Sequence, residues 1–559
     1  MYVMEQEKER KKRQWRRPVL SVLLLFLSFC GLILRLFSLQ KTAGQATDAA
    51  VGERYVAIDS SRGYIYDRHL RPLVNDTVSN TAAVLLSGQS DADGMRQEII
   101  SRYASCGVLP DTIVQNGACA VFETEKEIPA TTVSINLKTV ERYGSGDLCR
   151  HILGYVDAEG NGVGGIEEAF DRLLKETGGR LGVRWVSDAA GRALMGKGLK
   201  TENENYHNAA GVVLTIDKEI QSLTRAAMAH SGVKKGAAVV LDAEDSAILA
   251  SVSVPVFSLD HMEAALTDPD HPFLNRALAA YPVGSVFKPF VAASAIDHAV
   301  ATNVSFVCTG SISVGDESFR CYQQNAHGEM DLTSAVCKSC NTYFIDLGRR
   351  VGAGHLLKTA EAFGFGAEIR LTGTLKSDKG NLPTPESLSL PAALANFSFG
   401  QGDLLASPLQ LAAAYAALAR GGVYKTPYLM KAIVDEDRKE TAYYLPEGQG
   451  RAAQTSTCEI VCGSLRENMI SGTGVNGSAS NVTAAGKTAT AQTGDYDAAG
   501  AERLCTWFCG FIPYEKPRYV IVILNEDGSV ASEDCAPVFR EISQKLTALS
   551  ASGATGERE

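Results

Sequence analysis

A run of uncharged, largely apolar residues near the N-terminus limits what this chain can form more than any other feature. The run "PVLSVLLLFLSFCGLIL", Pro18 to Leu34, follows the basic stretch "EKERKKRQWRR". A run of about 17 residues is at the short end of what crosses the hydrocarbon core of a bilayer, and Arg35 can extend its charge to the headgroups. We therefore expect a membrane anchor over residues 18–39.

Cleavage is the alternative fate of such a segment. A signal peptide carries a shorter apolar region followed closely by a cleavage site of small residues, and "LFSLQKTAG" offers only a poor one. We therefore expect the anchor to be retained. Because positively charged flanks stay in the cytoplasm, residues 1–17 are predicted to be cytoplasmic and the bulk of the chain, from about residue 40, extracytoplasmic.

Length and composition indicate a multidomain globular protein. The chain has 559 residues, which suggests about two to four domains. Hydrophobic residues make up 45% and charged residues 21%, as in ordinary globular proteins. The net charge of −10 gives no support to nucleic-acid binding. The 13 cysteines are thinly spread, which is not the disulfide framework of a small secreted domain.

Residues beyond about 210 predict an α+β domain with an antiparallel sheet, because helices lie between early and late strands. The predicted elements are a strand over 212–216 followed by a helix that Asp217 caps, a β-hairpin over 236–254, a glycine-terminated helix over 407–422, and buried strands over 504–512 and 518–524.

The first candidate for chemistry is the stretch "YPVGSVFKPF", which holds Ser285 and Lys288. The spacing is i, i+3, so on a helix both side chains share one face. A serine hydroxyl needs a base to take its proton, and a lysine serves as that base only when its pKa is lowered by burial or by another cation. The apolar residues around Lys288 distinguish this pair from Ser231 and Lys234 in "SGVKK", which have the same spacing at a solvated helix end.

Two further motifs follow along the chain. "AVCKSCNTYF" contains Ser339 and Asn341, a hydroxyl that can relay a proton and a carboxamide that can hold a substrate amide. "GKTATAQTGD" contains Lys487 in an alternating, glycine-preceded segment that ends in a turn, as an edge strand beside a cleft would. Each motif alone is common by chance, but their order and spacing together indicate one site.

In this combination the chain resembles a class B penicillin-binding protein, a membrane-anchored D,D-transpeptidase of bacterial cell-wall synthesis. The S-x-x-K and K-T-G patterns belong to the wider superfamily. The segments that carry the resemblance are "NRALAAYPVGSVFKPF", "SCNTYF", "GKTATAQ", "FGQGDLLASPLQLAAAYAALARGG", "RGYIYDR" and "GVGGIEEAFDRLL". Together they span nearly everything from the anchor to about residue 543.

The resemblance implies a division of the chain into five segments. The transpeptidase domain is expected to have a central antiparallel sheet flanked by helices, and the domain before it to be an extended, β-rich pedestal of the dimerisation type. The segments are a cytoplasmic stretch 1–17, the anchor 18–39, the pedestal 40–208, the transpeptidase domain 209–546 and a disordered tail 547–559.

The resemblance also implies roles for the residues of the first two motifs. Ser285 would attack the D-Ala–D-Ala carbonyl of a peptidoglycan stem peptide and form an acyl-enzyme, and Lys288 would accept its proton. Ser339 and Asn341 would line the cleft, with Ser339 passing the proton toward the leaving D-alanine. An amine from a second stem peptide would then resolve the ester, which gives a cross-link.

Residues of the third motif are expected to bind the substrate. Lys487 would steady the terminal carboxylate of the donor and help to keep Lys288 neutral by repulsion. Thr488 would hydrogen-bond the same carboxylate. The backbone N–H groups of Ser285 and Thr490 would form the oxyanion hole, in which each donor typically contributes about 3 kcal/mol or more.

One position departs from the pattern of the family. The third motif normally ends in glycine, and this chain has Ala489. Glycine lets the substrate backbone approach closely, and a methyl group is the smallest possible intrusion. We therefore expect activity to survive. The affinity for β-lactams, which lie along this strand, is expected to be affected more strongly.

Cysteine and histidine patterns near the second motif are interpreted as structural. "CKSC" has the spacing of half a zinc site, but the sequence offers no matching second pair at zinc distances, so Cys337 and Cys340 are taken as structural or incidental thiols. Cys308 and Cys321 are candidates for an extracellular disulfide. His327 is interpreted as a cleft-wall residue in preference to a metal ligand, and no cofactor or metal is expected.

Two alternatives to a transpeptidase stay open. A D,D-carboxypeptidase or β-lactamase would use water as the acceptor, although such hydrolases rarely need a pedestal and a retained anchor. A non-catalytic scaffold or β-lactam sensor with a degraded site is suggested by Ala489 alone. Class B members lack a glycosyltransferase domain of their own, so the resemblance further implies a SEDS-family glycan polymerase as a partner in the membrane.

Overall fold

The computed structural model places a single apolar helix, Ser21–Ser38, ahead of the folded part of the chain. Among the described residues it is the one helix long and apolar enough to cross a membrane, and its apolar side chains are exposed. The predicted cytoplasmic stretch 1–17 lies outside the described residues. The structure describes residues 21–38, 52–86, 92–144, 148–300, 302, 306–322, 325–444, 448–496 and 499–556.

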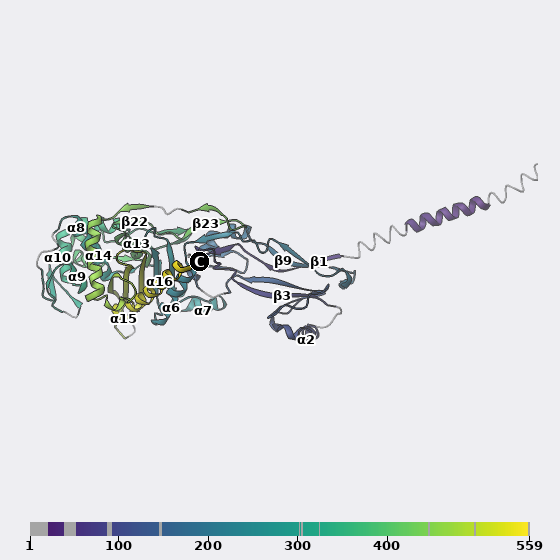
Figure 1. Cartoon of the computed structure of the whole chain (residues 1–559), viewed down its shortest axis with the longest axis horizontal. Coiled ribbons are helices and arrows are strands. Elements are labelled where there is room, and N and C mark those ends of the chain that lie inside the picture. The colour runs from purple at the N-terminus through teal and green to yellow at the C-terminus, as the bar shows by residue number, and fades with distance from the viewer. Residues whose placement is uncertain are drawn as a thin grey trace, which may run out of the picture. The chain divides into compact units, whose positions relative to one another are not determined.

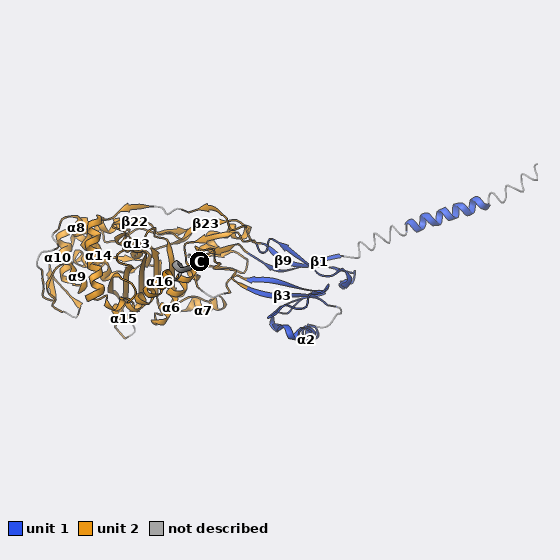
Figure 2. Ribbon diagram, in the orientation of Figure 1, with its two compact units in different colours: residues 1–61, 78–140, 179–207 blue, residues 62–77, 141–178, 208–559 orange. Residues whose placement is uncertain are grey.

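Two compact units make up the chain, and their boundaries differ from the predicted pedestal (Figure 2). Unit 1 holds residues 1–61, 78–140 and 179–207, and unit 2 holds residues 62–77, 141–178 and 208–559. The predicted end of the pedestal at 208 coincides with the last boundary between the units. Two segments expected in the pedestal, 62–77 and 141–178, belong instead to unit 2, because their apolar side chains, such as Ile65, Ile152 and Leu174, join its main core.

Unit 1 is β-rich, as the sequence predicts. In one sheet, β9 (Arg180–Ser187) lies between β1 (Gly52–Ser60) and β10 (Lys200–Glu204) and is antiparallel to both. A second sheet has the order β4-β5-β3-β6, formed by Val114–Asn116, Cys119–Thr124, Thr77–Leu85 and Ser134–Glu141. Helix α2 (Ala92–Arg102) covers it by packing Met95 and Ile99 against Val84 and Phe122.

Unit 2 is built on a five-stranded antiparallel sheet with the order β13-β12-β28-β27-β26. Its strands are Ile248–Val254, Gly236–Asp242, Tyr519–Gly528, Glu502–Ile512 and Ala485–Tyr496. The predicted hairpin over 236–254 and the two predicted late strands are confirmed. Strand β26, which carries the third motif, is an edge strand, so one side of its backbone is left without a strand partner in this sheet.

The two faces of this sheet pack against different helices, because successive side chains of a strand point to opposite sides. On β12, Val239 and Leu241 join the core that contains α13 (Pro408–Ala419). Ala238 and Val240 join the core that contains α6 (Lys218–His230) and α16 (Ala536–Gly556). The nearly all-apolar strands predicted from the sequence thus form the middle layer, between α13 on one side and α6 and α16 on the other (Figure 1).

Local capping explains where the two predicted helices begin. Asp217 accepts hydrogen bonds from the backbone N–H groups of Glu219 and Ile220 at the start of α6. Ser407 and Gln410 form a reciprocal capping box at the start of α13, which Pro408 follows as the first helical residue. Both predictions are confirmed.

The remaining helices that matter for the site gather at one end of unit 2 (Figure 1). They are α8 (Lys288–Asp297), α9 (Leu332–Cys337), α10 (Asn341–Val351) and α14 (Thr455–Ser471). Helix α8 packs against both α10 and α14, and α14 packs against β26. The first residue of α8 is Lys288 and the first residue of α10 is Asn341, so each helix begins at a residue of a candidate motif.

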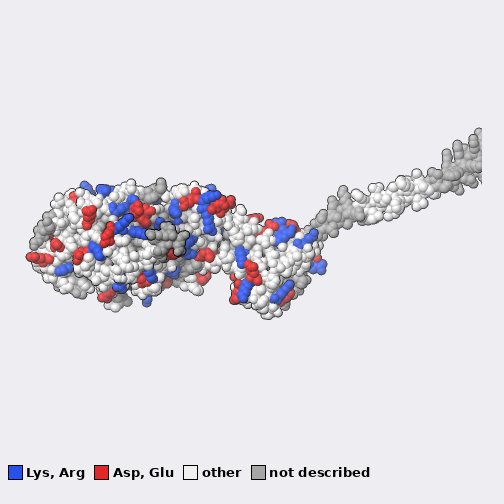
Figure 3. All heavy atoms as spheres, in the orientation of Figure 1, with Lys and Arg blue, Asp and Glu red and all other residues white. Residues whose placement is uncertain are grey.

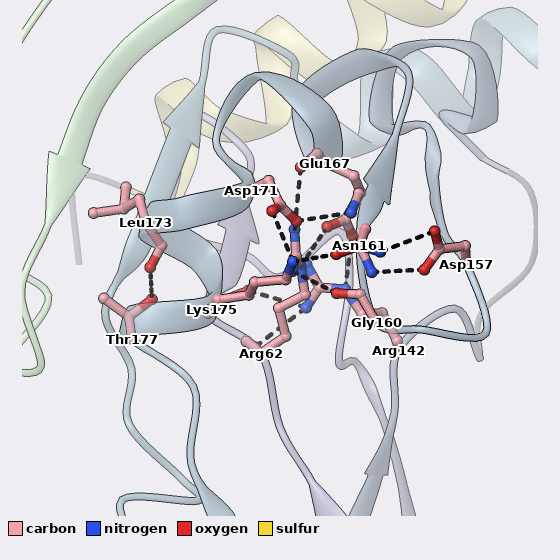
Figure 4. A network of polar contacts seen from close by, with 12 residues as sticks. Arg62, Arg142, Asp157, Gly160, Asn161, Glu167, Asp171, Leu173, Lys175 and Thr177 are labelled. Carbon is pink, nitrogen blue, oxygen red and sulfur yellow. Dashed lines mark hydrogen bonds and ion pairs between the residues drawn. The ribbon is translucent and has the colours of Figure 1, made fainter.

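A buried ion-pair network ties the early segments of unit 2 together (Figure 4). The carboxylate of Glu167, 0% exposed, accepts from Nε of Arg62 at 2.8 Å and from Nε of Arg142 at 2.7 Å. Arg62 also donates to Asp171 at 2.7 Å, and the hydroxyl of Tyr143 donates to Glu167 at 2.9 Å. The motif "RGYIYDR" is thereby fixed to "GVGGIEEAFDRLL", two segments that the resemblance placed in the pedestal.

The C-terminal end corrects one prediction. The sequence predicts a disordered tail from residue 547, but helix α16 continues to Gly556. Leu549 packs against the core of α6 and α16, and the hydroxyl groups of Tyr519 and Ser550 lie 3.2 Å apart. The small, alanine-rich residues of this stretch are compatible with a helix that already has a buried face. Residues 557–559 lie outside the described part.

Charge is mixed on the visible surface. Figure 3 shows basic and acidic residues interspersed on the face in view, without a continuous basic patch. Such a face lacks the electrostatic footprint of a nucleic-acid-binding surface.

Candidate active site

The segment with the first motif is held in place by contacts from three other parts of unit 2. It forms a short 3-10 turn, η5 (Gly284–Phe287), directly before α8. The backbone N–H of Gly284 donates to the carbonyl of Gly400 at 2.8 Å, and the hydroxyl of Tyr415 donates to the carbonyl of Val286 at 2.9 Å. The indole N–H of Trp507 donates to the carbonyl of Pro282 at 2.9 Å. Ser285 lies inside this framework and is half-buried.

Lys288 is fully buried and directed at the second motif. Its Nζ donates to the carbonyl of Ser339 at 2.6 Å and to Oδ1 of Asn341 at 2.7 Å, and lies 3.2 Å from Oγ of Ser339. Burial of the amine lowers the pKa of Lys288 to about 7, against a small opposing influence of the thiols of Cys340 and Cys321.

The contacts of Lys288 suit a neutral amine. A neutral amine has two N–H groups and one lone pair, whereas the ammonium form has three donors and no acceptor. The carbonyl of Ser339 and the amide oxygen of Asn341 are acceptors only, and they take both N–H groups. The lone pair is then left for a hydroxyl group, which is the arrangement a general base needs.

Lys487, in the third motif, contacts the hydroxyl of Ser339 as Lys288 does. It is the third residue of β26 and is fully buried. Its Nζ lies 3.0 Å from Oγ of Ser339, 2.9 Å from the carbonyl of Thr488 and 3.5 Å from Oγ1 of Thr473. Burial, together with the nearby charge of Lys288, holds the pKa of Lys487 well below its usual value. Burial is thus the main cause of the lowered pKa of both amines, and repulsion by the charge of Lys288 adds to it at Lys487.

The backbone around the second motif is unusual. Ser339 has φ = 51°, in the left-handed region that residues other than glycine rarely adopt. This conformation separates the end of α9 from the start of α10 and turns both the carbonyl and the hydroxyl of Ser339 toward Lys288. The amide of Asn341 is fixed at both ends, since its Nδ2 donates to the carbonyl of Arg320 at 3.0 Å.

The third motif lies against the first. A Cβ atom built on Gly284, which has φ = 67°, would be 3.3 Å from Cβ of Ala489 and 3.0 Å from Cβ of Ala491. The methyl group of Ala489 therefore fills space next to Gly284, where a larger pair of residues would collide. Within the motif, Oγ1 of Thr488 donates to Oγ1 of Thr473 at 2.7 Å, and Oγ1 of Thr490 accepts from the backbone N–H of Ala531 at 3.4 Å.

The three predicted neighbourhoods converge. Lys288, Ser339, Asn341 and Lys487 are joined by hydrogen bonds, and Ser285 and Ala489 are linked through Gly284. Among the described residues, Ser285 Oγ has no hydrogen bond, and the partners of Lys288 are all on the second motif. No sequence motif pointed to Thr473, which contacts both Lys487 and Thr488 from the loop after α14.

The candidate disulfide beside the second motif is not formed in the structure. Cys308 and Cys321 are free thiols whose Sγ atoms lie 3.7 Å apart, well beyond the length of a disulfide bond. Nδ1 of His327 lies 3.4 Å from Sγ of Cys308, and Sγ of Cys340 lies 3.8 Å from Sγ of Cys321. These four side chains form a group that could ligate a metal ion. The sequence did not reveal it because the residues are 13, 6 and 13 positions apart, unlike the paired ligands of common zinc motifs.

Comparisons with known proteins agree with this geometry. The family model of the penicillin-binding protein transpeptidase domain matches residues 236–544. The chain is 29% identical over 459 residues to peptidoglycan D,D-transpeptidase MrdA of Haemophilus influenzae, covering 75% of this chain and 67% of that protein. It is 26% identical over 454 residues to stage V sporulation protein D of Bacillus subtilis, covering 78% and 68%. A crystal structure of the D,D-transpeptidase domain of a peptidoglycan glycosyltransferase from Eggerthella lenta superposes with a TM-score of 0.63 and 25% identity, covering 88% of this chain and 99% of that one.

Proposed function

We propose that this chain, which belongs to the penicillin-binding protein transpeptidase family, is a peptidoglycan D,D-transpeptidase that cross-links stem peptides through a serine acyl-enzyme. The observation that carries the proposal is the position of the Ser339 hydroxyl, 3.2 Å from Nζ of Lys288 and 3.0 Å from Nζ of Lys487. One hydroxyl between two buried amines is a path along which a proton can move.

The acylation step uses the first motif. Ser285 Oγ attacks the carbonyl carbon between the two terminal D-alanines, and its proton goes to the lone pair of neutral Lys288. The carbonyl oxygen gains negative charge in the tetrahedral intermediate, which the backbone N–H groups of Ser285 and Thr490 stabilise. The unpaired edge of β26 supports a role of this strand in binding the extended donor peptide.

Collapse of the intermediate uses the second motif. The C–N bond breaks, and the leaving D-alanine needs a proton on its nitrogen. Ser339 donates its own proton to that nitrogen and is reprotonated by the Lys288 ammonium, so the base returns to its neutral state. Asn341 holds Lys288 through Oδ1, and its remaining N–H is directed away from Arg320 and can bind a substrate amide.

Residues of the third motif bind the carboxylate end of the donor. Lys487 and Thr488 supply a cation and a hydroxyl on one edge strand, and Thr473 holds both in place. The methyl group of Ala489 packs beside Gly284, which supports the expectation that this alanine does not abolish activity. A second stem peptide then supplies the amine that attacks the acyl carbon. The ester C–O bond breaks, and the proton lost by the amine passes through Lys288 to Oγ of Ser285.

Labelling of the full-length protein in detergent with a fluorescent penicillin tests the acyl-enzyme. The variant Ser285→Ala should lose covalent labelling while its melting temperature stays unchanged. Ser231→Ala is the matched control, because Ser231 has the same S-x-x-K spacing at the end of α6. Persistent labelling of Ser285→Ala, or loss of labelling in Ser231→Ala, would refute the assignment of the nucleophile.

The acceptor separates a transpeptidase from a hydrolase. A donor peptide that ends in D-Ala–D-Ala, incubated with and without an amine acceptor, should give the cross-linked amide in the first case. A D,D-carboxypeptidase would release the hydrolysed peptide in both cases, a β-lactamase would leave the peptide intact and hydrolyse a penicillin, and a scaffold would act on neither. Mass spectrometry of the products from the peptide and from a penicillin distinguishes these outcomes.

The helix Ser21–Ser38 supports attachment to the membrane by a single span. With the basic stretch 1–17 in the cytoplasm, the folded units lie outside the membrane, where peptidoglycan is found. A SEDS-family glycan polymerase is the partner we expect in the membrane. Protease added to spheroplasts should degrade the folded units from outside, and their full protection would contradict this orientation.

A further inference from the structure

A buried asparagine on α14 joins the third motif to the loop that follows this helix. Asn468 is 0% exposed, and its Nδ2 donates to the carbonyl of Gly486 at 2.8 Å. Its Oδ1 accepts from Oγ1 of Thr473 at 3.2 Å. Gly486 directly precedes Lys487 on β26, and Thr473 contacts both Lys487 and Thr488. Both ends of the amide are therefore bonded to direct neighbours of the groups expected to bind the donor carboxylate.

The loop after α14 is folded closely around this side chain. The backbone carbonyl of Asn468 accepts from the N–H groups of Gly472 at 3.1 Å and of Gly474 at 3.2 Å. A Cβ atom built on Gly472 would collide with Oδ1 of Asn468, and one built on Gly474 would lie 2.8 Å from its Nδ2. The backbone N–H of Thr473, between the two glycines, donates at 3.1 Å to the carbonyl of Cys337, the last residue of α9. The amide thus lies where α14, α9 and β26 are joined.

The amide also fixes the direction of the Thr473 proton. The carbonyl of Gly486 can only accept, so the amide turns its N–H₂ group toward Gly486 and its oxygen toward Thr473. The amide oxygen can likewise only accept, so it takes the single proton of Thr473. The oxygen of Thr473 is then an acceptor for the hydroxyl of Thr488 at 2.7 Å and for Nζ of Lys487 at 3.5 Å. Two donors of the third motif are thus held on one common oxygen.

Packing alone gives no reason for an amide at this position. A buried amide is costly unless its groups are hydrogen-bonded, and an apolar side chain of the same size fills the space without that cost. The side chain of Asn468 bonds the residue before Lys487 and a hydroxyl that contacts Lys487. Ser464, one turn earlier on α14 and also buried, instead contacts Thr333 of α9 at 3.0 Å. The amide is therefore directed at the third motif, whereas the serine is not.

We propose that Asn468 is a positioning residue of the carboxylate-binding site, which acts through Gly486 and Thr473. It holds Lys487 and Thr488 ready for the carboxylate of the donor peptide or of a β-lactam, and this role rests on the proposed transpeptidase function. Donors that are already fixed lose little freedom when the carboxylate binds, which favours its binding. Without the amide, the Thr473 proton loses its acceptor and turns to Thr488, so the two donors lose the oxygen that holds them together.

Two labels, one with and one without a carboxylate, test this role. The full-length protein in detergent is labelled with a fluorescent penicillin and with the methyl ester of the same compound, and the readout is the ratio of the two second-order rates. In the wild type the free acid should react about tenfold or more faster than the ester, because the carboxylate makes charge-assisted hydrogen bonds. Both rates come from the same preparation, so the fraction of folded protein cancels in the acid-to-ester ratio.

Four variants and one control follow from the contacts. Asn468→Leu and Thr473→Val should each lower the acid-to-ester ratio about tenfold and raise the concentration of free acid that gives half the maximal labelling rate. Thr473→Ser, which keeps the hydroxyl, should retain the ratio of the wild type. The double variant Asn468→Leu, Thr473→Val should lose less than the two single losses combined, because both residues belong to one network. Ser464→Ala, the matched control on α14, should leave the ratio unchanged.

The outcomes separate this role from a structural one and from the proposed function. Acid and ester rates that fall equally in Asn468→Leu and Thr473→Val, or do not fall in either, would overturn the proposal. If Asn468→Leu does not fold, Thr473→Val decides alone, since its backbone bond to Cys337 does not need the side chain. A wild type labelled equally by acid and ester keeps acyl transfer but overturns this inference. A wild type labelled by neither compound overturns the acyl-transfer function, and the inference with it.

Discussion

The pH dependence of acylation should follow the protonation of Lys288. This amine is 0% exposed, and burial lowers its pKa from 10.5 to about 7. Such a lowering corresponds to about 5 kcal/mol of extra free energy for protonating the buried group. With a pKa near 7, the neutral fraction is about 9% at pH 6 and about 91% at pH 8. The rate of acylation should therefore rise about tenfold between these pH values and then level off.

Two variants separate the role of Lys288 as a base from its role as a charge or a filler of space. Pseudo-first-order labelling with a fluorescent penicillin, measured from pH 5.5 to 9 on the full-length protein, gives the rate at each pH. Lys288→Arg keeps a cation that stays protonated over this range, and Lys288→Met keeps the bulk without a base. Both should be slower than the wild type by about 10²- to 10⁴-fold, without the rise between pH 6 and 8. Melting temperatures show whether each variant is folded.

The reasoning has two clear ways to fail. A wild-type rate that changes less than twofold between pH 6 and 8 would mean that the amine is not the titrating base. A Lys288→Arg variant that keeps the same rise would mean that another group takes the proton. The label's own reactivity with hydroxide is measured with Ser285→Ala and subtracted.

Three further perturbations follow from the packing. Gly284→Ala should slow labelling and destabilise the protein by about 1–2 kcal/mol or more, because φ of Gly284 is positive and the new methyl group would meet Cβ of Ala491 at 3.0 Å. Labelling rates and urea midpoints equal to those of the wild type would contradict this. Ala489→Gly should reduce stability by about 0.5–1 kcal/mol. It should lower the KM for a β-lactam and change the maximal acylation rate little. Labelling that appears only in this variant would show that the alanine blocks the site. Glu167→Gln should destabilise unit 2 by about 3–5 kcal/mol in denaturant unfolding, because the buried guanidinium group of Arg62 and the half-buried one of Arg142 lose the Glu167 carboxylate. A loss under about 1 kcal/mol would mean that solvent or other partners replace it.

Much of the transpeptidase unit could be predicted because its signals are local. The hairpin over 236–254 alternates around a turn, and α6 and α13 start at Asp217 and Ser407 with the caps that their sequences specify. Apolar strands that are buried on both faces predict the middle layer of the sheet. The order of the motifs then predicts which residues meet, although no local rule places Ser285 near Lys487.

Other features depend on tertiary contacts that no local pattern contains. Residues 62–77 and 141–178 belong to unit 2 because of the Glu167 ion pairs and the burial of their apolar side chains, neither of which has a periodic signature. The continuation of α16 beyond residue 546 depends on the packing of Leu549 against α6 and the sheet. The cysteine and histidine group depends on four segments folding back on one another, so its spacing along the chain carries no motif.

Burial of Lys288 and Lys487, the two amines proposed to act in the reaction, should make activity sensitive to packing long before the protein unfolds. The pKa of Lys288 is low because water is excluded, and any loosening that admits water raises it toward 10.5. At pH 7, a rise from about 7 to about 8 cuts the neutral fraction from about 50% to about 9%, a loss of about fivefold in the base. Phe287 and Phe290 flank Lys288 in sequence, and the ring centroid of Phe344 lies 5.6 Å from Nζ of Lys288. Substitutions of these three residues should therefore affect acylation and its pH midpoint more than their distance from the nucleophile suggests. A truncation such as Phe290→Leu that lowers the rate at pH 7 but not at pH 9 would separate this effect from a loss of folded protein, which lowers the rate at every pH.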